Sequence, residues 1–285
     1  YGDLSLAMSV SVPLLTAQII AEHGSEEQKS QLLPEFAAGS IFHVGLGVNN
    51  AALSTDPYQS SVLVKESGED IILNGAKTGI AFAEEANSFL ISASNESGEC
   101  NLYFVSKDQE GIELESKEFM GLKGAPFSQI TFTNCKINAS QKLGGHNYSI
   151  DFQALIDSSR IGMSALALGV CQAVLDYVIP YTNERVAFDE PISNRQSVAF
   201  LVADMAIETE ALRLMVYKAA ALKDLDEDFH KHASLTYRFA SHHGMKIGTD
   251  GVQLLGGHGF THEHPVELWY RNLRAIGIFE GGAGV

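Results

Sequence analysis

The chain contains the stretch Q-L-L-G-G-H-G-F at residues 253–260, where a helix-forming segment meets three glycines. Adjacent glycines are typical of a helix C-cap, because glycine adopts left-handed backbone conformations without a steric penalty. Glycines also allow a ligand to approach the backbone closely. Gly256 and Gly257 therefore fit either an ordinary helix end or a cofactor-binding turn.

Around this stretch, the segment from Tyr148 to Val285 has the residue spacing of a helical bundle. Ser193 and Gln196 form a predicted capping box at the start of a long helix, since a serine followed three positions later by a glutamine can satisfy two helix N–H groups. We expect a bundle of about four helices. Apolar residues recur on one core-facing side of the long helix: Val198, Leu201, Val202, Met205, Leu212 and Met215.

One helix of this bundle has to be distinguished from a membrane span. Its most apolar stretch, residues 163–179, is interrupted by Gln172 and Asp176. No uninterrupted apolar run reaches the roughly eighteen residues that a span requires, so we expect a buried helix and no membrane span. Pro180 is expected to kink or end this helix, because proline lacks a backbone N–H.

The middle segment, residues 41–147, has a different pattern. Short runs rich in β-branched and aromatic residues alternate with glycine-containing turns such as Asn74-Gly75 and Ser97-Gly98. Closely spaced strands of this kind predict a small antiparallel barrel or sandwich. The clearest runs are residues 62–64, 71–73, 89–92, 102–105 and 130–132.

The first segment, residues 1–40, is predicted to be helical again. Gly24 ends a first helix, and Ser25 with Gln28 forms the capping box of a second. The order helix, β, helix indicates an α+β protein in which the β part is a layer of its own. Because Tyr1 falls inside the helical pattern, we expect any targeting peptide to be absent or removed. The apolar positions of the first helix are Leu14, Leu15, Ile19 and Ile20.

The composition excludes some classes of ligand. The formal net charge is −16, and the sequence has no Lys and Arg cluster that would give the basic face of a nucleic-acid-binding protein. The widely spaced Cys100, Cys135 and Cys171 favour buried thiols in a reducing compartment. The histidines form no H-E-x-x-H motif and have no cysteine pair beside them, so we expect no metal site.

Several separated motifs resemble those of the acyl-CoA dehydrogenase family. The stretch 253–260 is similar to the family's Q-x-x-G-G-x-G-F/Y, and residues 24–39, 73–77 and 121–132 resemble parts of its N-terminal helical and β domains. A single motif is weak, but the ordered set covers nearly the whole chain. The C-terminal matches are Asp157 and Arg160 in D-x-x-R, Arg185 and Phe188 in R-x-x-F, Gln196, Pro265, Glu267, Arg271 and Glu280-Gly281-Gly282.

The resemblance implies the family's architecture. Residues 1–40 would be the end of an N-terminal helical domain, residues 41–147 a middle β-barrel or sandwich domain, and residues 148–285 a C-terminal four-helix bundle. The family's chains extend beyond these limits, so we expect this chain to be truncated at both termini.

The resemblance also implies a reaction, the FAD-dependent conversion of an acyl-CoA thioester to trans-2-enoyl-CoA. In such enzymes a carboxylate removes the proton α to the thioester carbonyl, while the β hydrogen leaves as hydride to flavin N5. Glu280 matches the position of this catalytic base. Taken alone, a Glu in a glycine-rich turn is more simply a surface carboxylate, so the catalytic interpretation rests on the family match.

Binding residues follow from the same resemblance. Asp157 and Arg160 match positions near the CoA thioester arm, and an ordinary ion pair at i, i+3 on a helix surface is the alternative. For Gln196 the alternative is the capping box with Ser193. The FAD-binding positions are Thr55 in the β domain and, for the ADP half of the FAD in a neighbouring subunit, Arg185, Phe188, Gln196, Gln253, Gly256 and Gly257.

The motifs around the flavin ring differ from those of the family. Only Thr55 and Asp56 resemble the end of its T-E-x-x-x-G-S-D motif, and its W-I-T/S is replaced by Gly79-Ile80-Ala81. The Trp that covers one flavin face and the hydroxyl that can bond flavin N5 are both missing. We expect empty space beside Gly79 and weak or partner-dependent FAD binding, which the double change Gly79→Trp with Ala81→Thr should improve.

Two functions remain open from the sequence. Glu280 favours an active FAD-dependent acyl-CoA dehydrogenase, a flavoprotein oxidoreductase of fatty acid and lipid metabolism. Gly79 and Ala81 favour a flavin-poor, catalytically degenerate member that serves as a partner or structural subunit of a heteromeric acyl-CoA dehydrogenase. The implied partners are acyl-CoA, an electron-transfer flavoprotein or similar acceptor, and further subunits in a homodimer, homotetramer or heteromer. The implied location is cytoplasmic, or the mitochondrial matrix in a eukaryote.

Overall fold

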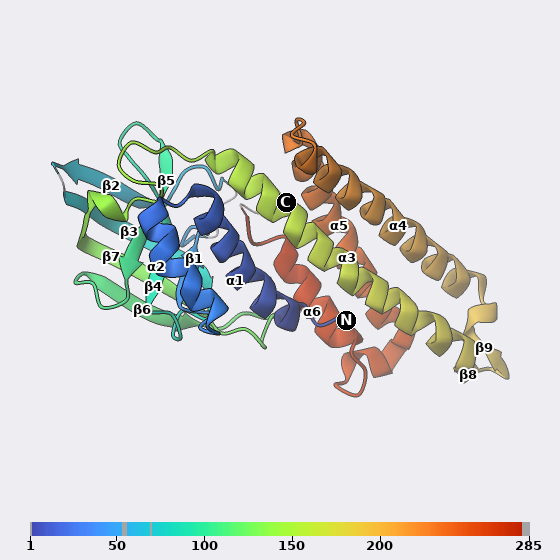
Figure 1. Ribbon diagram of the computed structural model, residues 1–285. Coiled ribbons are helices and arrows are strands. Elements are labelled where there is room, and N and C mark those ends of the chain that lie inside the picture. Colours follow the sequence, from blue (N-terminus) through green and yellow to red (C-terminus); the bar gives the residue numbers. More distant parts are fainter. Residues whose placement is uncertain (1, 53–55, 69, 281–285) are drawn as a thin grey trace.

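The computed structural model describes residues 2–52, 56–68 and 70–280. Figure 1 shows a curled sheet at one end of the molecule and a bundle of long helices at the other, with α1 and α2 lying against the sheet. The predicted α+β class and the order helices, sheet, helical bundle are thereby confirmed.

The N-terminal helices are α1, Leu4–His23, and α2, Glu26–Ala37. The predicted capping box is present, because Gln28 N donates to Ser25 Oγ at 3.2 Å and Ser25 N donates to Gln28 Oε1 at 3.0 Å. Gln28 also donates to the Lys142 carbonyl at 2.9 Å, which ties α2 to the end of the β part. Of the predicted apolar positions, Ile19 and Ile20 are buried and Leu15 is partly buried, but Leu14 is 64% exposed.

The sheet contains every strand that the sequence predicted, and two more. Its strands are paired in the order β1-β4-β2-β3-β7-β6, with β5 on β4. The expectation of a purely antiparallel sheet was wrong in two places, since β4 pairs in parallel with both β1 and β2. The strands are β1 Val44–Gly47, β2 Val62–Ser67, β3 Asp70–Ala81, β4 Ser88–Ser94, β5 Cys100–Ser106, β6 Ile112–Lys117 and β7 Phe127–Asn138.

The bundle is formed by four long helices, as the sequence predicted for residues 148–285. Met205 and Leu212 of the predicted stripe are buried, and Val198, Leu201 and Val202 pack partly buried against the same core. The elements are α3 Phe152–Glu184, α4 Gln196–Asp224, α5 His230–Leu255 and α6 Val266–Ile276, with a small hairpin of β8, Val186–Ala187, and β9, Glu190–Pro191.

Two local predictions in the bundle need correction. Of the two outcomes expected at Pro180, an end of the helix is wrong, because α3 continues to Glu184, and a kink stays a prediction. Proline removes one N–H, and the packing of a 33-residue helix outweighs that loss. The capping box of Ser193 and Gln196 does not form either. Ser193 lies in a 3₁₀ turn, and within the described chain α4 begins at Gln196 after Arg195 without a side-chain cap.

Two helices, α1 and α3, are long and apolar enough to cross a membrane by length and composition alone. In α3, 61% of the apolar window is buried inside the protein, as expected of a core helix. The window of α1 is 39% buried. All three cysteines are buried free thiols, as predicted.

The connection from the N-terminal helices to the sheet runs between Ala37 and Val44, and the connection from the sheet to the bundle runs between Asn138 and Phe152. The domain boundaries that we expect at residues 40 and 147 fall within these two connections and stay a prediction.

Candidate active site

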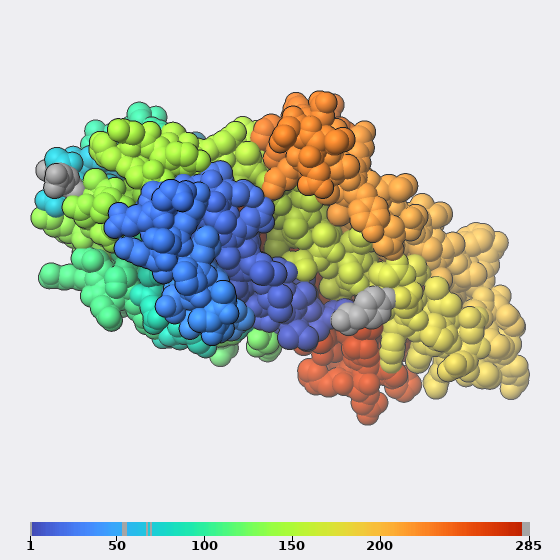
Figure 2. Space-filling view, in the orientation of Figure 1, coloured from blue at the N-terminus to red at the C-terminus, as the bar shows by residue number. Residues whose placement is uncertain are grey.

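A cavity of about 740 Å³ lies between α1, α3 and the edge of the sheet. We call it the base cavity, because Glu280 lies in its wall. Figure 2 shows the surface hollowed between α1 and the connection from α4 to α5, with α3 at the floor of the hollow. Three segments that are far apart in the sequence therefore form one site, which opens to the surface.

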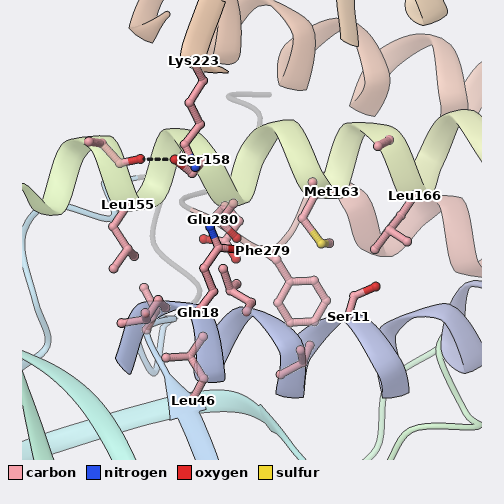
Figure 3. A pocket seen from close by; sticks show the side chains of 18 of the residues that line it. Ser11, Gln18, Leu46, Leu155, Ser158, Met163, Leu166, Lys223, Phe279 and Glu280 are labelled. Atoms are coloured by element: carbon pink, nitrogen blue, oxygen red, sulfur yellow. Dashed lines mark hydrogen bonds between the residues drawn. The ribbon is translucent and has the colours of Figure 1, made fainter. Parts of the chain in front are cut away.

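The two ends of the base cavity differ in polarity. In Figure 3, Ser11, Met163 and Leu166 lie to one side of Glu280 and Leu155 lies to the other, with Ser158 and Lys223 above Glu280 and Gln18 below it. The first end continues into apolar side chains, namely Met8 and Val12 of α1 and Phe127 and Phe279. The second end is polar and lined by Glu22, His23, Asp151, Lys223, Asp226, Glu227 and His230. The cavity can thus take a molecule with an apolar tail and a polar remainder.

Glu280 follows α6 and adopts a left-handed backbone conformation with φ 54°. The residue as a whole is partly exposed, but its carboxyl group is enclosed by protein. Burial raises the pKa of this carboxyl above its ordinary value, and a Ser159 hydrogen bond and the Arg160 charge oppose the rise. A carboxylate with a raised pKa beside an apolar cavity is suited to remove a proton from a bound ligand near neutral pH.

Side chains from three other segments hold the backbone before and at Glu280. Glu280 N donates to Asn49 Oδ1 at 3.0 Å, and Arg160 donates to the Glu280 carbonyl from Nη2 at 3.1 Å and from Nε at 3.3 Å. The Tyr237 hydroxyl donates to the carbonyls of Ile276 and Phe279. The position of Glu280 is therefore fixed by contacts from outside its own segment.

Asp157 and Arg160 form the ion pair that the sequence suggested, at 3.0 Å, but the pair is buried and does not lie on a helix surface. Asp157 also contacts His230 Nδ1 at 2.9 Å, and Arg160 donates to the Tyr58 hydroxyl at 3.2 Å. Within the described chain, neither Asp157 nor Arg160 lines the base cavity. Direct contact of these two residues with a thioester arm stays a prediction.

Lys77, from the N-G-x-K motif, is fully buried and stabilises the loop that carries Asn49. Its ammonium donates to the Val48 carbonyl at 3.0 Å and to Asn50 Oδ1 at 2.9 Å, on either side of Asn49. Burial lowers the pKa of Lys77 to about 7. This lysine therefore helps to position Asn49, which bonds Glu280.

The expectation of empty space beside Gly79 was wrong. Gly79 is left-handed, with φ +67°, and a Cβ added there would lie 2.8 Å from Cε1 of Phe279. Phe279 stacks on Phe127 with ring centroids 5.8 Å apart and lies edge-on to Phe119 at 6.3 Å. An aromatic ring thus fills the space beside Gly79, but it comes from the residue before Glu280 and not from β3.

A second cavity, of about 610 Å³, brings together four residues that the sequence assigned to the ADP half of a flavin: Arg185, Gln253, Gly256 and Gly257. We call it the hairpin cavity, because Arg185 immediately precedes the β8–β9 hairpin. Figure 1 shows this hairpin at the end of the bundle remote from the sheet. The base cavity lies where the bundle meets the sheet, so the two cavities lie at opposite ends of the bundle.

The donors in the hairpin cavity are available to a ligand. Among residues 2–52, 56–68 and 70–280, no partner is found for the Arg185 guanidinium. Gly256 has φ 59° and caps α5, which confirms the helix C-cap interpretation. A Cβ added at Gly256 or Gly257 would meet no described atom within 4 Å, so the backbone faces open space that a ligand can enter. Cofactor binding by these residues stays a prediction.

The remaining predicted cofactor residues lie elsewhere. Phe188 is 86% exposed at the tip of the hairpin, where the Arg195 guanidinium lies 4.9 Å from its ring centroid. Gln196 is the exposed first residue of α4. Neither is part of the hairpin cavity as far as the described residues show. Thr55, Gly281 and Gly282 lie outside the described residues.

Sequence reasoning missed Asn49, Tyr58, Tyr237 and Phe279. Each acts through a partner far away in the chain; Glu280, for example, is 231 residues from Asn49. No local pattern signals such a contact. Only the position of Phe279, next to the predicted base, could have suggested that it lies at the site.

The residues of both cavities fit a flavin dinucleotide held in two halves. The hairpin cavity offers a guanidinium for which the described residues supply no partner, and open glycine backbone; both suit a pyrophosphate. The base cavity offers an apolar wall of Ala81, Phe127 and Phe279 beside Glu280. The two cavities lie at opposite ends of the bundle, and how one cofactor would use both belongs to the proposal below.

Comparison with known protein families gives two matches. Residues 48–135 match the acyl-CoA dehydrogenase middle domain, and residues 151–285 match the acyl-CoA dehydrogenase C-terminal domain. The chain is similar to a probable acyl-CoA dehydrogenase of Mycobacterium tuberculosis, with 35% identity over 98% of this chain and 73% of the relative. It is 33% identical to the human mitochondrial short-chain specific acyl-CoA dehydrogenase, over 98% of this chain and 69% of the relative.

Solved structures agree with these matches. The glutaryl-CoA dehydrogenase of Mycobacterium smegmatis in complex with FADH2 superposes on this chain with a TM-score of 0.86 and 26% identity. The superposition covers 96% of this chain and 71% of that one.

Proposed function

The chain belongs to the acyl-CoA dehydrogenase family of oxidoreductases, and on that basis we propose that it catalyses the FAD-dependent α,β-dehydrogenation of an acyl-CoA thioester to trans-2-enoyl-CoA. The observation that carries the proposal is the enclosed carboxyl of Glu280 in a cavity with one apolar and one polar end. The apolar end suits the acyl chain, and the polar end suits the thioester arm.

Glu280 is the proposed base. Its raised pKa brings the carboxyl closer to the pH at which it both stays ionised and accepts a proton readily. Phe279 and Phe127 give the cavity an apolar wall that would limit the access of water to the carbanion that proton removal begins to form. Bound FAD would accept the β hydrogen as hydride.

Arg185, Gln253, Gly256 and Gly257 are the proposed contacts of the ADP half of FAD, with Phe188 and Gln196 beside them and Thr55 at the ring. Because these residues lie at the far end of the subunit, the FAD that they bind would belong to a neighbouring subunit. We therefore propose a dimer or a dimer of dimers with more than about 1,000 Å² buried in the shared interface. Sedimentation showing a monomer that retains FAD would contradict this arrangement.

An electron-transfer flavoprotein or similar acceptor is the proposed redox partner. The proposed location is the cytoplasm, or the mitochondrial matrix in a eukaryote. Buried free thiols at Cys100, Cys135 and Cys171 suit the reducing conditions of both compartments.

The function can be tested by following flavin absorbance. The protein is reconstituted with FAD, made anaerobic and mixed with saturated short-, medium- and long-chain acyl-CoAs. At least one should bleach the oxidised flavin, and the length that bleaches it fastest identifies the substrate. Stoichiometric FAD that no acyl-CoA bleaches would contradict the proposal.

A second candidate is a flavin-poor subunit that completes a site in another chain. It is supported by Phe279, which occupies the space beside Gly79 where a flavin-covering side chain would stand. Such a homomer should lose FAD on dialysis and regain it with a partner chain. FAD that stays bound at one per subunit through extensive dialysis would exclude this candidate.

A further inference from the structure

The segment that carries Glu280 has a backbone arrangement that it does not stabilise by itself. Helix α6 ends at Ile276, and Glu280, four residues later, has φ 54°. Residues with a Cβ rarely adopt this conformation unless their surroundings hold them in it. The question is which side chains impose it.

Tyr237 holds the segment from the α5 side. It is 2% exposed, and its hydroxyl hydrogen is shared between the carbonyls of Ile276 and Phe279. Burial raises the pKa of this phenol, with the Glu280 charge adding to the rise and Arg160 opposing it. Tyr237 is therefore a proton donor throughout the working pH range, and its bonds span the turn that leads to Glu280.

Arg160 holds the same segment from the α3 side. Two of its nitrogens donate to the Glu280 carbonyl, at 3.1 and 3.3 Å, and its guanidinium carbon lies 5.8 Å from the ring centroid of Tyr237. Asp157 fixes the guanidinium from below at 3.0 Å, and Ser234 accepts a further bond at 3.3 Å. The Arg160 guanidinium is thus held in one orientation by hydrogen bonds to other groups of the protein.

Asn49 completes the arrangement by accepting the Glu280 N–H at 3.0 Å. Both backbone polar groups of Glu280 are therefore bonded to side chains, and the carbonyl of the preceding residue is bonded to Tyr237. A segment held at three successive points has little freedom to rotate, so the direction of the Glu280 carboxyl is set by α3, α5 and the loop after β1.

We propose that Tyr237 and Arg160 are positioning residues, which hold residues 276–280 so that the Glu280 carboxyl points at the reacting carbon of the ligand. This role rests on the proposed function of Glu280 as the base. It gives Arg160 a task different from direct contact with the thioester arm. It also predicts that loss of either residue lowers kcat more than it changes KM, because the base is displaced while the cavity remains.

The first test is Tyr237→Phe, which removes only the hydroxyl. With FAD-reconstituted full-length protein, kcat should fall about tenfold to a hundredfold, since displacing a catalytic group by about 1 Å has effects of this size. KM should stay within about twofold. Tyr177→Phe is the matched control, because it removes another bundle hydroxyl, bonded to His264 Nδ1 at 2.6 Å, away from Glu280. The control should keep kcat within about twofold.

The second test is the pH–rate profile of Arg160→Gln. Charged and titratable groups near Glu280 are Arg160 and Asp157 of α3, His230 and Tyr237 of α5, and Tyr58. The base cavity is also lined by Glu22 and His23 of α1, Asp151, Lys223 of α4, and Asp226 and Glu227 just after α4. Removing the Arg160 charge, which opposes the rise in the pKa of Glu280, should move the acid limb of the profile to higher pH. Tyr237→Phe should leave that limb in place, so the two variants separate a change of charge from a change of position.

The outcomes distinguish the two proposals. If Glu280→Gln is inactive while Tyr237→Phe and Arg160→Gln both keep the kcat and pH profile of the parent, the positioning role is wrong and the base assignment stands. If Glu280→Gln keeps its activity, the base assignment itself fails. Should Tyr237→Phe not fold, as judged by its thermal melt, Arg160→Gln decides, and Arg160→Lys should recover the profile but not the full kcat.

Discussion

The base cavity and the hairpin cavity are built in opposite ways. Around the base, Asp157, Arg160 and Tyr237 are at most 9% exposed and bond one another or the backbone of residues 276–280. In the hairpin cavity, Arg185 and Gln253 are exposed, and no partner of Arg185 is found within the described ranges. The polar groups around Glu280 are bonded within this chain, whereas the described residues supply no partner for the Arg185 guanidinium at the far end of the bundle.

This difference has consequences for energy as well as for geometry. A buried polar group must be bonded, because an unsatisfied one costs about 1–3 kcal/mol, so the base cavity is rigid and its pKa values are shifted. An exposed guanidinium can remain hydrated until a ligand arrives. We therefore propose that the chemistry is located at the base cavity and that affinity for an anionic cofactor is located at the hairpin cavity.

The largest expected effect comes from Glu280→Gln, which should separate chemistry from binding. The amide keeps the shape of the side chain but cannot act as a base, so kcat should fall by about 10²–10⁴-fold. FAD content should not change, because the hairpin cavity is untouched. Glu227→Gln, an exposed carboxylate at the polar end of the base cavity, is the control and should change kcat by less than about tenfold. Near-normal turnover of Glu280→Gln would place the base elsewhere.

Arg185→Ala should produce the converse result. Loss of a charge-assisted hydrogen bond of about 1.5–3 kcal/mol should weaken FAD binding by roughly tenfold to a hundredfold. The pH profile of the FAD-saturated enzyme should be unchanged, since Glu280 keeps its surroundings. Arg238→Ala removes another exposed arginine of the bundle and serves as control. Equal FAD affinity of both variants, measured by fluorescence titration, would show that the hairpin cavity does not bind the cofactor.

Gly79→Ala tests whether the wall of the base cavity is as closed as the position of Phe279 indicates. The left-handed backbone and the contact with Phe279 should together destabilise the fold by about 1–3 kcal/mol. Gly169→Ala on α3, where an added Cβ meets no described atom within 4 Å, should instead stabilise by about 0.5–1 kcal/mol. Thermal melts of the two variants show whether each substitution lowers or raises the stability of the fold.

The same geometry reverses our expectation for Gly79→Trp with Ala81→Thr. An indole beside Phe279 has no room without displacing that ring, so the double variant should retain FAD less well than the parent. Improved retention in a dialysis assay would show that Phe279 moves away when FAD binds.

The smallest expected effect is the pH dependence of stability. Burial raises the pKa of Glu280 in the folded state. At a pH between the ordinary and the raised pKa, Glu280 is therefore protonated in the folded protein but ionised in the unfolded chain. The free energy of unfolding should therefore fall as pH rises through this window. Glu280→Gln should remove that fall and melt at a slightly higher temperature at neutral pH. A melting curve with the same pH dependence in both proteins would mean that the carboxyl is solvated.

The sequence by itself determined what depends on near neighbours in the chain. The Ser25–Gln28 capping box, the glycine C-cap at Gly256 and the strand runs of the middle segment were predictable, because backbone propensity and hydrogen bonding within four residues decide them. The ordered motifs also predicted the family and, with it, Arg185, Gln253 and Glu280 as candidates.

Only the tertiary structure decided which of these groups meet. Tyr237, Arg160 and Asn49 contact the segment 276–280 across separations of 39 to 231 residues. Phe279 fills the space beside Gly79 although it lies far from Gly79 in the sequence. The Ser193–Gln196 pattern also predicted a capping box, but Ser193 lies in a 3₁₀ turn and the box does not form. A local sequence pattern predicts only the structure that a segment can form by itself, whereas buried contacts depend on which distant segment packs against it. Because a buried polar group without a hydrogen bond costs free energy, tertiary packing decides which of the locally possible structures forms.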